Sequence, residues 1–298
     1  MVKLLFRCFG LLLLFLVSTR LPATAHAEPD AAPSPAAVAR QAQQTAQVAQ
    51  PTPIVPSPSD PLRPAFQLYA EFDLPVLGIG LVFAAARLTR EQKAYCAPLC
   101  DRDDLNALDR KTAGYWSPAW QLTSDIGLYA LGAGAAVLMV ADEGFLNALN
   151  DGVVIAESAL AAIATASIMT LAANRPRPFL YGEDAPLSAR NSSDASLSFL
   201  SSHAAVSFAT ATSTLMAIRR LHPKGPLPFI VAGAGGSLAT LVAVSRVLGG
   251  KHFITDALGG AIVGVSLGVL IPALHGSPVR LVPNVGAEQR GLSFMGRF

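Results

Sequence analysis

The chain has 298 residues, of which 52% are hydrophobic and only 14% are charged. An average soluble domain has about 25% charged residues, so this composition, with a mean hydropathy of +0.44, favours a protein that lies in a membrane. The net charge of +2 and the dispersed basic residues exclude a strongly basic nucleic-acid-binding surface.

Residues 1–27 have the pattern of a secretory signal peptide. A basic start precedes the short apolar run Leu11–Val17, and the small-residue sequence Ala23–Ala27 offers cleavage sites after its second and third alanines. The apolar run is shorter than the roughly 20 residues of a membrane-spanning helix. We therefore expect this segment to be removed during export, with an uncleaved anchor as the alternative.

Two regions separate the signal peptide from the main apolar part of the chain. Residues 28–61 are rich in alanine, proline, glutamine and serine, and we expect a disordered linker because they cannot bury enough apolar surface to fold. Residues 62–123 are predicted to form an N-terminal helix and a polar loop that holds Cys96 and Cys100. The spacing of these cysteines, without a nearby histidine, is poor for zinc, and an exported chain favours a disulfide. Two unpaired thiols are the alternative.

The rest of the chain contains apolar segments that are rich in glycine, alanine and serine, the residues that let membrane helices approach closely. These segments are Leu74–Ala86, Ile126–Ala141, Ser158–Ala173, Ala204–Ile218, Gly225–Val244 and Ala257–Leu274. They predict an all-α fold, a polytopic membrane bundle of five to six helices, with residues 124–275 as the catalytic part and residues 276–298 as a tail. Because several segments have fewer than about 20 residues, a soluble all-α protein is the alternative.

The loop Arg219–Lys224 is short and basic, so the positive-inside rule predicts that it lies in the cytoplasm. The neighbouring loops 175–202 and 246–251 then face outward. A cleaved signal peptide also starts the chain outside, so an even number of crossings must precede the first of these loops. We therefore predict that Leu74–Ala86 is a re-entrant or interfacial segment and that five other segments cross. The expected location is a bacterial-type inner membrane, with an exported N-terminus and a periplasmic active site.

His252 and Asp256 are four residues apart, after Arg246 and a Gly-Gly turn, at the predicted start of a helix. This spacing places both side chains on one face, where the carboxylate can accept the imidazole N–H and leave the other ring nitrogen free to attack. Arg246 can hold an anion with two hydrogen bonds. An ordinary helix-capping pair is the alternative for these residues alone.

Ser201, Ser202 and His203 lie where a polar loop enters an apolar helix. Ser201 is a natural N-cap, and the free N–H groups of the first turn can bind an anion. His203 in that turn can protonate a leaving oxygen. A third cluster, which contains Arg175 and Arg177 between prolines, ends the preceding helix and adds two cations. The three clusters emerge on one membrane face and together indicate phosphoryl transfer without a metal or other cofactor.

These clusters resemble the signature of the type 2 phosphatidic acid phosphatase (PAP2) superfamily, which includes lipid phosphatases, bacterial acid phosphatases and vanadium haloperoxidases. Its Ser-Arg-x5-His-x3-Asp motif is matched by Ser245, Arg246, His252 and Asp256. Its Pro-Ser-Gly-His motif appears as Leu200-Ser201-Ser202-His203. Its Lys-x6-Arg-Pro motif keeps Arg177-Pro178 but has Thr170 where the lysine belongs.

The resemblance implies that His252 forms a phosphohistidine, that Asp256 orients it and that His203 protonates the leaving alkoxide. The phosphate oxygens would be held by the following residues: Arg177, Arg246, Ser201 and the Ser202 amide, with Arg175 and Thr170 as further candidates. The implied substrate is a phospholipid or prenyl phosphate.

Thr170 lacks the charge of the motif lysine, and losing a charged hydrogen bond costs on the order of 1.5–3 kcal/mol. A non-catalytic member that binds phosphate or anionic lipid is therefore one alternative. The signal peptide and short helices also suit a soluble periplasmic acid phosphatase, and the same pocket with bound vanadate would suit a haloperoxidase.

Overall fold

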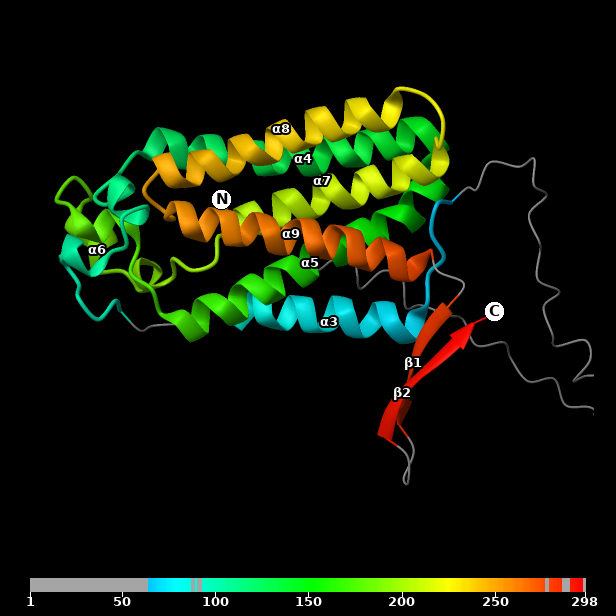
Figure 1. Cartoon of the computed structure of the whole chain (residues 1–298), viewed down its shortest axis with the longest axis horizontal. Helices are drawn as coiled ribbons and strands as arrows, with labels where there is room; N and C mark the ends of the chain where they lie inside the picture. The colour runs from blue at the N-terminus through cyan, green and yellow to red at the C-terminus, as the bar shows by residue number, and fades with distance from the viewer. Residues whose placement is uncertain (1–63, 87–88, 90–92, 277–278, 286–289, 297–298) are drawn as a thin grey trace, which may run out of the picture. The chain divides into compact units, whose positions relative to one another are not determined.

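The computed structural model describes residues 64–86, 89, 93–276, 279–285 and 290–296. The predicted signal peptide and linker lie outside the described residues. Within them, the fold is the predicted all-α bundle (Figure 1). Its α-helices are α3 (Ala70–Ala86), α4 (Pro118–Glu143), α5 (Phe145–Ala173), α6 (Leu187–Arg190), α7 (Ser202–Leu221), α8 (Leu227–Leu248) and α9 (Ile254–His275).

The shorter elements lie in the loops and the tail. Four 3-10 turns occur in the loops, at Arg102–Asp104, Asp109–Thr112, Pro178–Tyr181 and Ser193–Ser196. In the tail, β1 (Val279–Val285) pairs antiparallel with β2 (Arg290–Gly296), with Val279 opposite Gly296.

Helix α7 lies at the centre of the bundle and contacts α4, α5, α8 and α9. Its closest neighbour is α9, because Gly260, Gly264 and Gly268 on α9 face the α7 backbone. A Cβ atom at Gly260 would lie only 2.5 Å from the carbonyl oxygen of Ser201. This small-residue seam fixes the first turn of α7 against the first turn of α9, which are the two turns that carry the histidine motifs.

Four helix ends meet at one end of the bundle: the C-termini of α5 and α8 and the N-termini of α7 and α9 (Figure 1). The Cys96/Cys100 loop joins this end, where the Cys100 N–H donates to the Leu180 carbonyl oxygen at 2.8 Å. Cys96 and Cys100 form the predicted disulfide. We refer to this end, which carries the predicted catalytic motifs, as the catalytic end, and to the end that holds His275 as the distal end.

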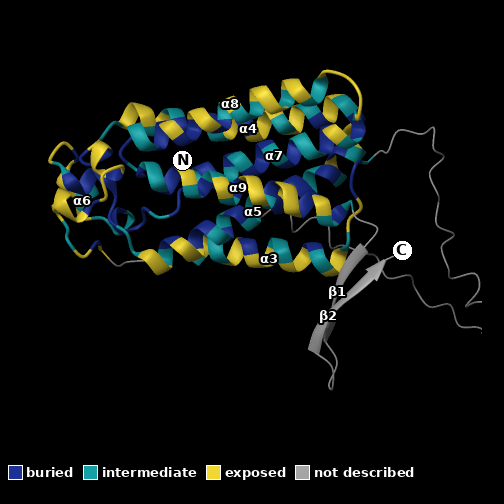
Figure 2. Cartoon of the chain, in the orientation of Figure 1, coloured by how far each residue is buried: buried dark blue, intermediate teal, exposed yellow. Residues whose placement is uncertain are grey.

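The outer surface of the bundle is apolar, as expected for a membrane protein. Helices α4, α8 and α9, and the segment that begins with α5, are long and apolar enough to cross a membrane. Large side chains such as Val137, Phe229 and Ile262 are more than 60% exposed on the sides of these helices (Figure 2). An exposed apolar surface of this extent is stable in lipid rather than in water.

The segment Leu74–Ala86, predicted to be re-entrant or interfacial, is helical and is not among the four candidate spans in the described residues. These residues belong to α3, which packs lengthwise along α5, with Gly80 against Leu160. Asp73 near its start contacts His275 at the distal end, whereas the chain after α3 continues into the loops of the catalytic end. Helix α3 therefore joins the two ends of the bundle. Its 17 residues are fewer than the roughly 20 of a typical membrane span, and that it does not cross stays a prediction.

Candidate active site

His252 lies in the turn between α8 and α9. Gly250 in this turn has a φ of +72°, and a Cβ atom there would collide with the carbonyl oxygen of Tyr115. Glycine is needed because it adopts this conformation without strain and leaves room for the neighbouring backbone. The turn directs His252 inward, and this residue is only 1% exposed.

The hydrogen bonds of His252 define which ring nitrogen can react. Its Nδ1 lies 2.6 Å from the carbonyl oxygen of Ser198, and a carbonyl only accepts, so Nδ1 carries the proton and Nε2 keeps its lone pair. Nε2 lies 3.4 Å from Nη1 of Arg177. Burial lowers the pKa of the His252 imidazole well below its usual range, and the charges of Arg177 and Arg246 lower it further. The ring is therefore neutral at neutral pH and available as a nucleophile.

The structure corrects the expected direct contact between Asp256 and His252. Asp256 Oδ2 accepts hydrogen bonds from Ser198 Oγ at 2.6 Å and from the Phe253 N–H at 2.9 Å. The imidazole donates instead to the Ser198 backbone. The reason is helix capping: a carboxylate in the first turn of α9 folds back to satisfy a free N–H at the start of its own helix. Asp256 thus reaches His252 only through Ser198.

Arg175 supports Asp256 and is not the replacement for the motif lysine that was considered from the sequence. Its guanidinium lies 2.5 Å from Asp256 Oδ1 and 2.7 Å from Asp109 Oδ2. It also stacks over the Phe253 ring, 4.3 Å from the centroid. Because these two buried carboxylates hold the guanidinium, it stabilises the start of α9 rather than a phosphate.

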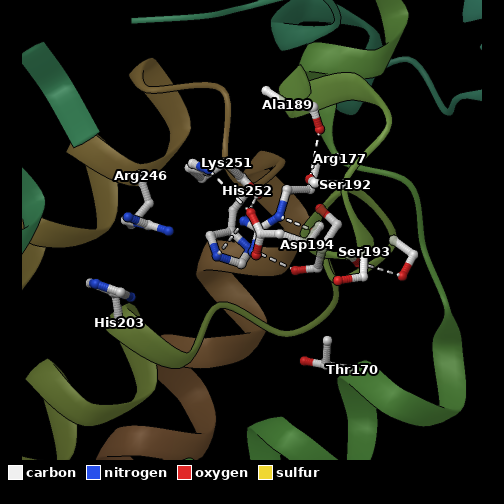
Figure 3. A network of polar contacts seen from close by, with 12 residues as sticks. Thr170, Arg177, Ala189, Ser192, Ser193, Asp194, His203, Arg246, Lys251 and His252 are labelled. Atoms are coloured by element: carbon white, nitrogen blue, oxygen red, sulfur yellow. Dashed lines mark hydrogen bonds and ion pairs between the residues drawn. The ribbon is translucent and has the colours of Figure 1, made fainter. Parts of the chain in front are cut away.

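Arg177 is held rigidly beside His252. Its Nε donates to the backbone carbonyl oxygen of Asp194 at 2.7 Å, and its Nη2 donates to the Asp194 carboxylate at 2.7 Å. Its Nη1 donates to the Lys251 carbonyl oxygen at 2.6 Å. Lys251 Nζ pairs with the other Asp194 carboxylate oxygen at 3.1 Å. Burial opposes the ionisation of Asp194, but Arg177 and Lys251 hold its pKa well below its usual range. Figure 3 shows this ion-pair network next to His252.

Arg246 and His203 lie together on one side of His252 (Figure 3). Both contact Asp125 of α4: His203 Nε2 is 2.9 Å from Oδ1, and Arg246 Nη1 is 3.5 Å from the same oxygen. Arg246 Nη1 also donates to Ser124 Oγ at 3.2 Å. Asp125 therefore holds a cation and an imidazole next to each other, in a position to act on the same bound group.

Ser201 is the N-cap of α7, as predicted, because its Oγ accepts a hydrogen bond from the Ala204 N–H at 3.4 Å. Ser202 follows as the first helical residue. Thr170 is not part of this cradle. Its buried hydroxyl lies 2.6 Å from the Ala166 carbonyl oxygen and 3.3 Å from that of Leu200, and Figure 3 shows it apart from His252. The single hydroxyl proton of Thr170 is directed at backbone carbonyls, so the hydroxyl cannot also donate to a phosphate. This corrects the phosphate contact considered for Thr170.

Five residues of the site were not recognised in the sequence: Asp109, Asp125, Asp194, Ser198 and Lys251. Two of them had a usable signal, since Lys251 directly precedes His252 and Ser198 lies three residues before Ser201. The three aspartates are isolated acidic residues in loops and on α4, and only the fold brings them to the cations.

A family model and a solved structure match this chain. Residues 151–279 match the family model described as the PAP2 superfamily. Among solved structures, the chain is similar to a transmembrane PAP2-type phosphatidylglycerolphosphate phosphatase from Bacillus subtilis, at 21% identity and a TM-score of 0.42, over 68% of this chain and 94% of that chain. The search of curated proteins found no match. The matched segment contains every motif residue from Arg177 to Asp256.

Proposed function

We propose that this protein hydrolyses a phosphate monoester or a diphosphate ester of a membrane lipid, through a phosphohistidine on His252. The observation that carries the proposal is the state of that imidazole. Its Nδ1 proton is committed to the Ser198 carbonyl, and its Nε2 lone pair lies beside Arg177 in a buried site. A neutral, oriented imidazole next to a fixed cation is what attack on a phosphate requires.

In the proposed first step, His252 Nε2 attacks phosphorus and a P–N bond forms while the ester P–O bond breaks. Burial and Arg246 lower the pKa of the free His203 imidazole to about 4, and Asp125 at 2.9 Å opposes this shift. His203 therefore gains its proton when the anionic phosphate binds, and it gives that proton to the leaving oxygen. In the second step, water attacks phosphorus, the P–N bond breaks, and His203 takes back a proton. Arg177, Arg246 and the N–H groups at the start of α7 hold the phosphate oxygens, with Ser201 and Ser202 contributing there.

Lys251 is the best candidate for the cation that Thr170 does not supply. It lies next to the nucleophile in sequence, and it shares the Asp194 carboxylate with Arg177. Its side chain is 18% exposed and lies against the rings of Phe179 and Trp116, at 5.4 and 5.7 Å from their centroids. These contacts fix the ammonium beside Arg177, where it adds a second positive charge to the site.

A lipid substrate fits the position of the site. The catalytic end coincides with the ends of helices whose sides are apolar and exposed. A phosphate headgroup can therefore enter at the membrane surface while its chains stay in the bilayer. The test is phosphate release by purified full-length protein from phosphatidic acid, phosphatidylglycerolphosphate and a prenyl diphosphate. Release from none of them by the wild-type protein would contradict the proposal.

We also propose that the catalytic end faces the periplasm, because the basic loop Arg219–Lys224 lies at the distal end. Single cysteines at Thr89 and Lys224, in a chain without the native cysteines, test this. The catalytic-end position should react with an impermeant thiol reagent in intact cells, and Lys224→Cys only after permeabilisation. The reverse pattern would refute the orientation.

A further inference from the structure

The distal end contains a buried cluster that the phosphatase reaction does not use. Asp73 of α3, Glu157 of α5 and His275 of α9 come together there, and one ligand atom from each lies within 4.8 Å of the others. His275 Nε2 is 2.9 Å from Asp73 Oδ1 and 3.2 Å from Glu157 Oε2. The side chains of Glu157 and His275 are fully buried, and that of Asp73 is 7% exposed.

The tautomer of His275 directs a lone pair at both carboxylates. Its Nδ1 lies 2.8 Å from the Ile271 carbonyl oxygen, so Nδ1 carries a proton and donates it. A neutral ring then presents the unprotonated Nε2 to Asp73 and Glu157. Metal-binding histidines have this arrangement, because a backbone carbonyl that accepts from one ring nitrogen fixes the other toward the ion.

The two carboxylates of the cluster, Asp73 and Glu157, lack a lysine or arginine ion-pair partner among the described residues. Both Glu157 carboxylate oxygens are buried without a hydrogen bond, although one forms the ion pair with His275. Protonation of Nε2 adds one positive charge against two negative ones. A divalent ion bound to neutral His275 balances both carboxylates, as buried charges require.

The ligands are also held in place around the cluster. Asp73 Oδ2 accepts the Tyr69 N–H at 2.7 Å, which leaves Oδ1 directed at His275. The rings of Tyr69 and Phe72 pack on the imidazole, with centroids 6.0 and 5.5 Å away. Neighbouring ligand atoms around an ion with bonds of about 2.0–2.1 Å lie roughly 3.0–3.4 Å apart, close to the two contacts of Nε2.

We propose that Asp73, Glu157 and His275 bind a divalent first-row transition metal ion, with Zn²⁺ the ion that suits one imidazole and two carboxylates. Such a site ties α3 to α5 and α9. His275 lies 23 residues after His252, nearly the full length of α9 away, so the ion has a structural role that is independent of catalysis.

The experiment measures metal in full-length protein extracted in detergent through a purification tag without histidine. Elemental analysis should find about one zinc per chain, and the chelated protein should bind Co²⁺ with the visible absorption of a low-symmetry N/O site. Glu157→Gln and His275→Gln should weaken Co²⁺ binding by at least about 10-fold. A loss of this size is typical even when the mutated residue only hydrogen-bonds to a metal ligand. Asp142→Asn is the matched control, because Asp142 pairs with His222 at the same end, 2.7 Å away, and is not part of the proposed site.

Chelation should lower the melting temperature of the wild-type protein and of Asp142→Asn, but not that of Glu157→Gln. Failure of the wild-type protein to bind Zn²⁺ or Co²⁺ would overturn the proposal without any variant. Binding that persists in both ligand variants would overturn it as well, because the ion would then lie elsewhere. If His252→Ala loses phosphatase activity but keeps a normal metal content, the metal site does not depend on the catalytic histidine. That result tests the two proposals separately.

Discussion

The two ends of the bundle are built from similar groups but differ in how they balance charge. At the catalytic end, Arg175, Arg177, Arg246 and Lys251 are paired with the carboxylates of Asp109, Asp125, Asp194 and Asp256. At the distal end, Asp73 and Glu157 both pair with His275, and no described lysine or arginine pairs with either of them. Fixed cations next to a neutral imidazole suit a phosphate, whereas an excess of carboxylates around one imidazole suits a metal ion. The same fold thus presents an anion site and a candidate cation site at opposite ends.

The largest expected effect comes from His252→Ala, which removes the nucleophile. We expect the rate of phosphate release to fall by at least about 10⁴-fold, as for other nucleophile deletions. The matched control is His222→Ala at the distal end, which removes a histidine paired with Asp142 and should keep wild-type activity. Equal losses in both variants would mean that the assay reports folding and not chemistry.

His203→Gln should have the next largest effect. Loss of a general acid costs about 10²–10⁴-fold for an alkyl phosphate, whose leaving oxygen needs a proton. The loss should be much smaller for 4-nitrophenyl phosphate, because that leaving group departs without protonation. Measuring kcat on the two substrates tests the role, and an identical loss on both would assign His203 to binding instead.

Lys251→Met removes the cation proposed to stand in for the motif lysine. Loss of a charged hydrogen bond of about 1.5–3 kcal/mol corresponds to roughly a 10- to 100-fold fall in kcat/KM. Lys224→Met, in the basic loop at the distal end, is the control and should behave like the wild-type protein. If Lys251→Met retains full activity, the site works with the two arginines alone.

Ser198→Ala should produce the smallest effect, a few-fold fall in kcat, because the lost hydrogen bond to Asp256 acts on His252 only indirectly. The Ser198 carbonyl remains to accept the His252 Nδ1 proton, so KM should change little. Steady-state kinetics of this variant test whether Asp256 acts through Ser198. An unchanged kcat would show that the carboxylate only caps α9.

The comparison of the two ends also explains what the sequence could and could not reveal. The helical bundle and the convergence of Arg177, His203, Arg246 and His252 were predictable, because short motifs mark helix ends and the positive-inside rule groups the loops. The prediction of a direct contact between Asp256 and His252 was wrong. Spacing along a helix places the carboxylate on the correct face, but capping of its own first turn decides which atom it binds.

The distal cluster had no such signal. Asp73 and His275 are 202 positions apart, and each alone is an unremarkable polar residue near a helix end. Helix α3 was predicted not to cross, so nothing in the sequence brought Asp73 next to α9. The three proposed ligands come together because α3 packs lengthwise on α5. The sequence motifs could therefore predict the anion site but not the proposed cation site.

Direct detection of the phosphorylated enzyme is the most decisive test of the central claim. The full-length protein is mixed with excess lipid phosphate, stopped with alkali to preserve a phosphohistidine, digested and analysed by mass spectrometry. The account predicts phosphate on the peptide that contains His252, and none in His252→Ala. Phosphate on another residue, or rapid turnover with no phosphorylated peptide under conditions that trap a control phosphohistidine enzyme, would contradict it.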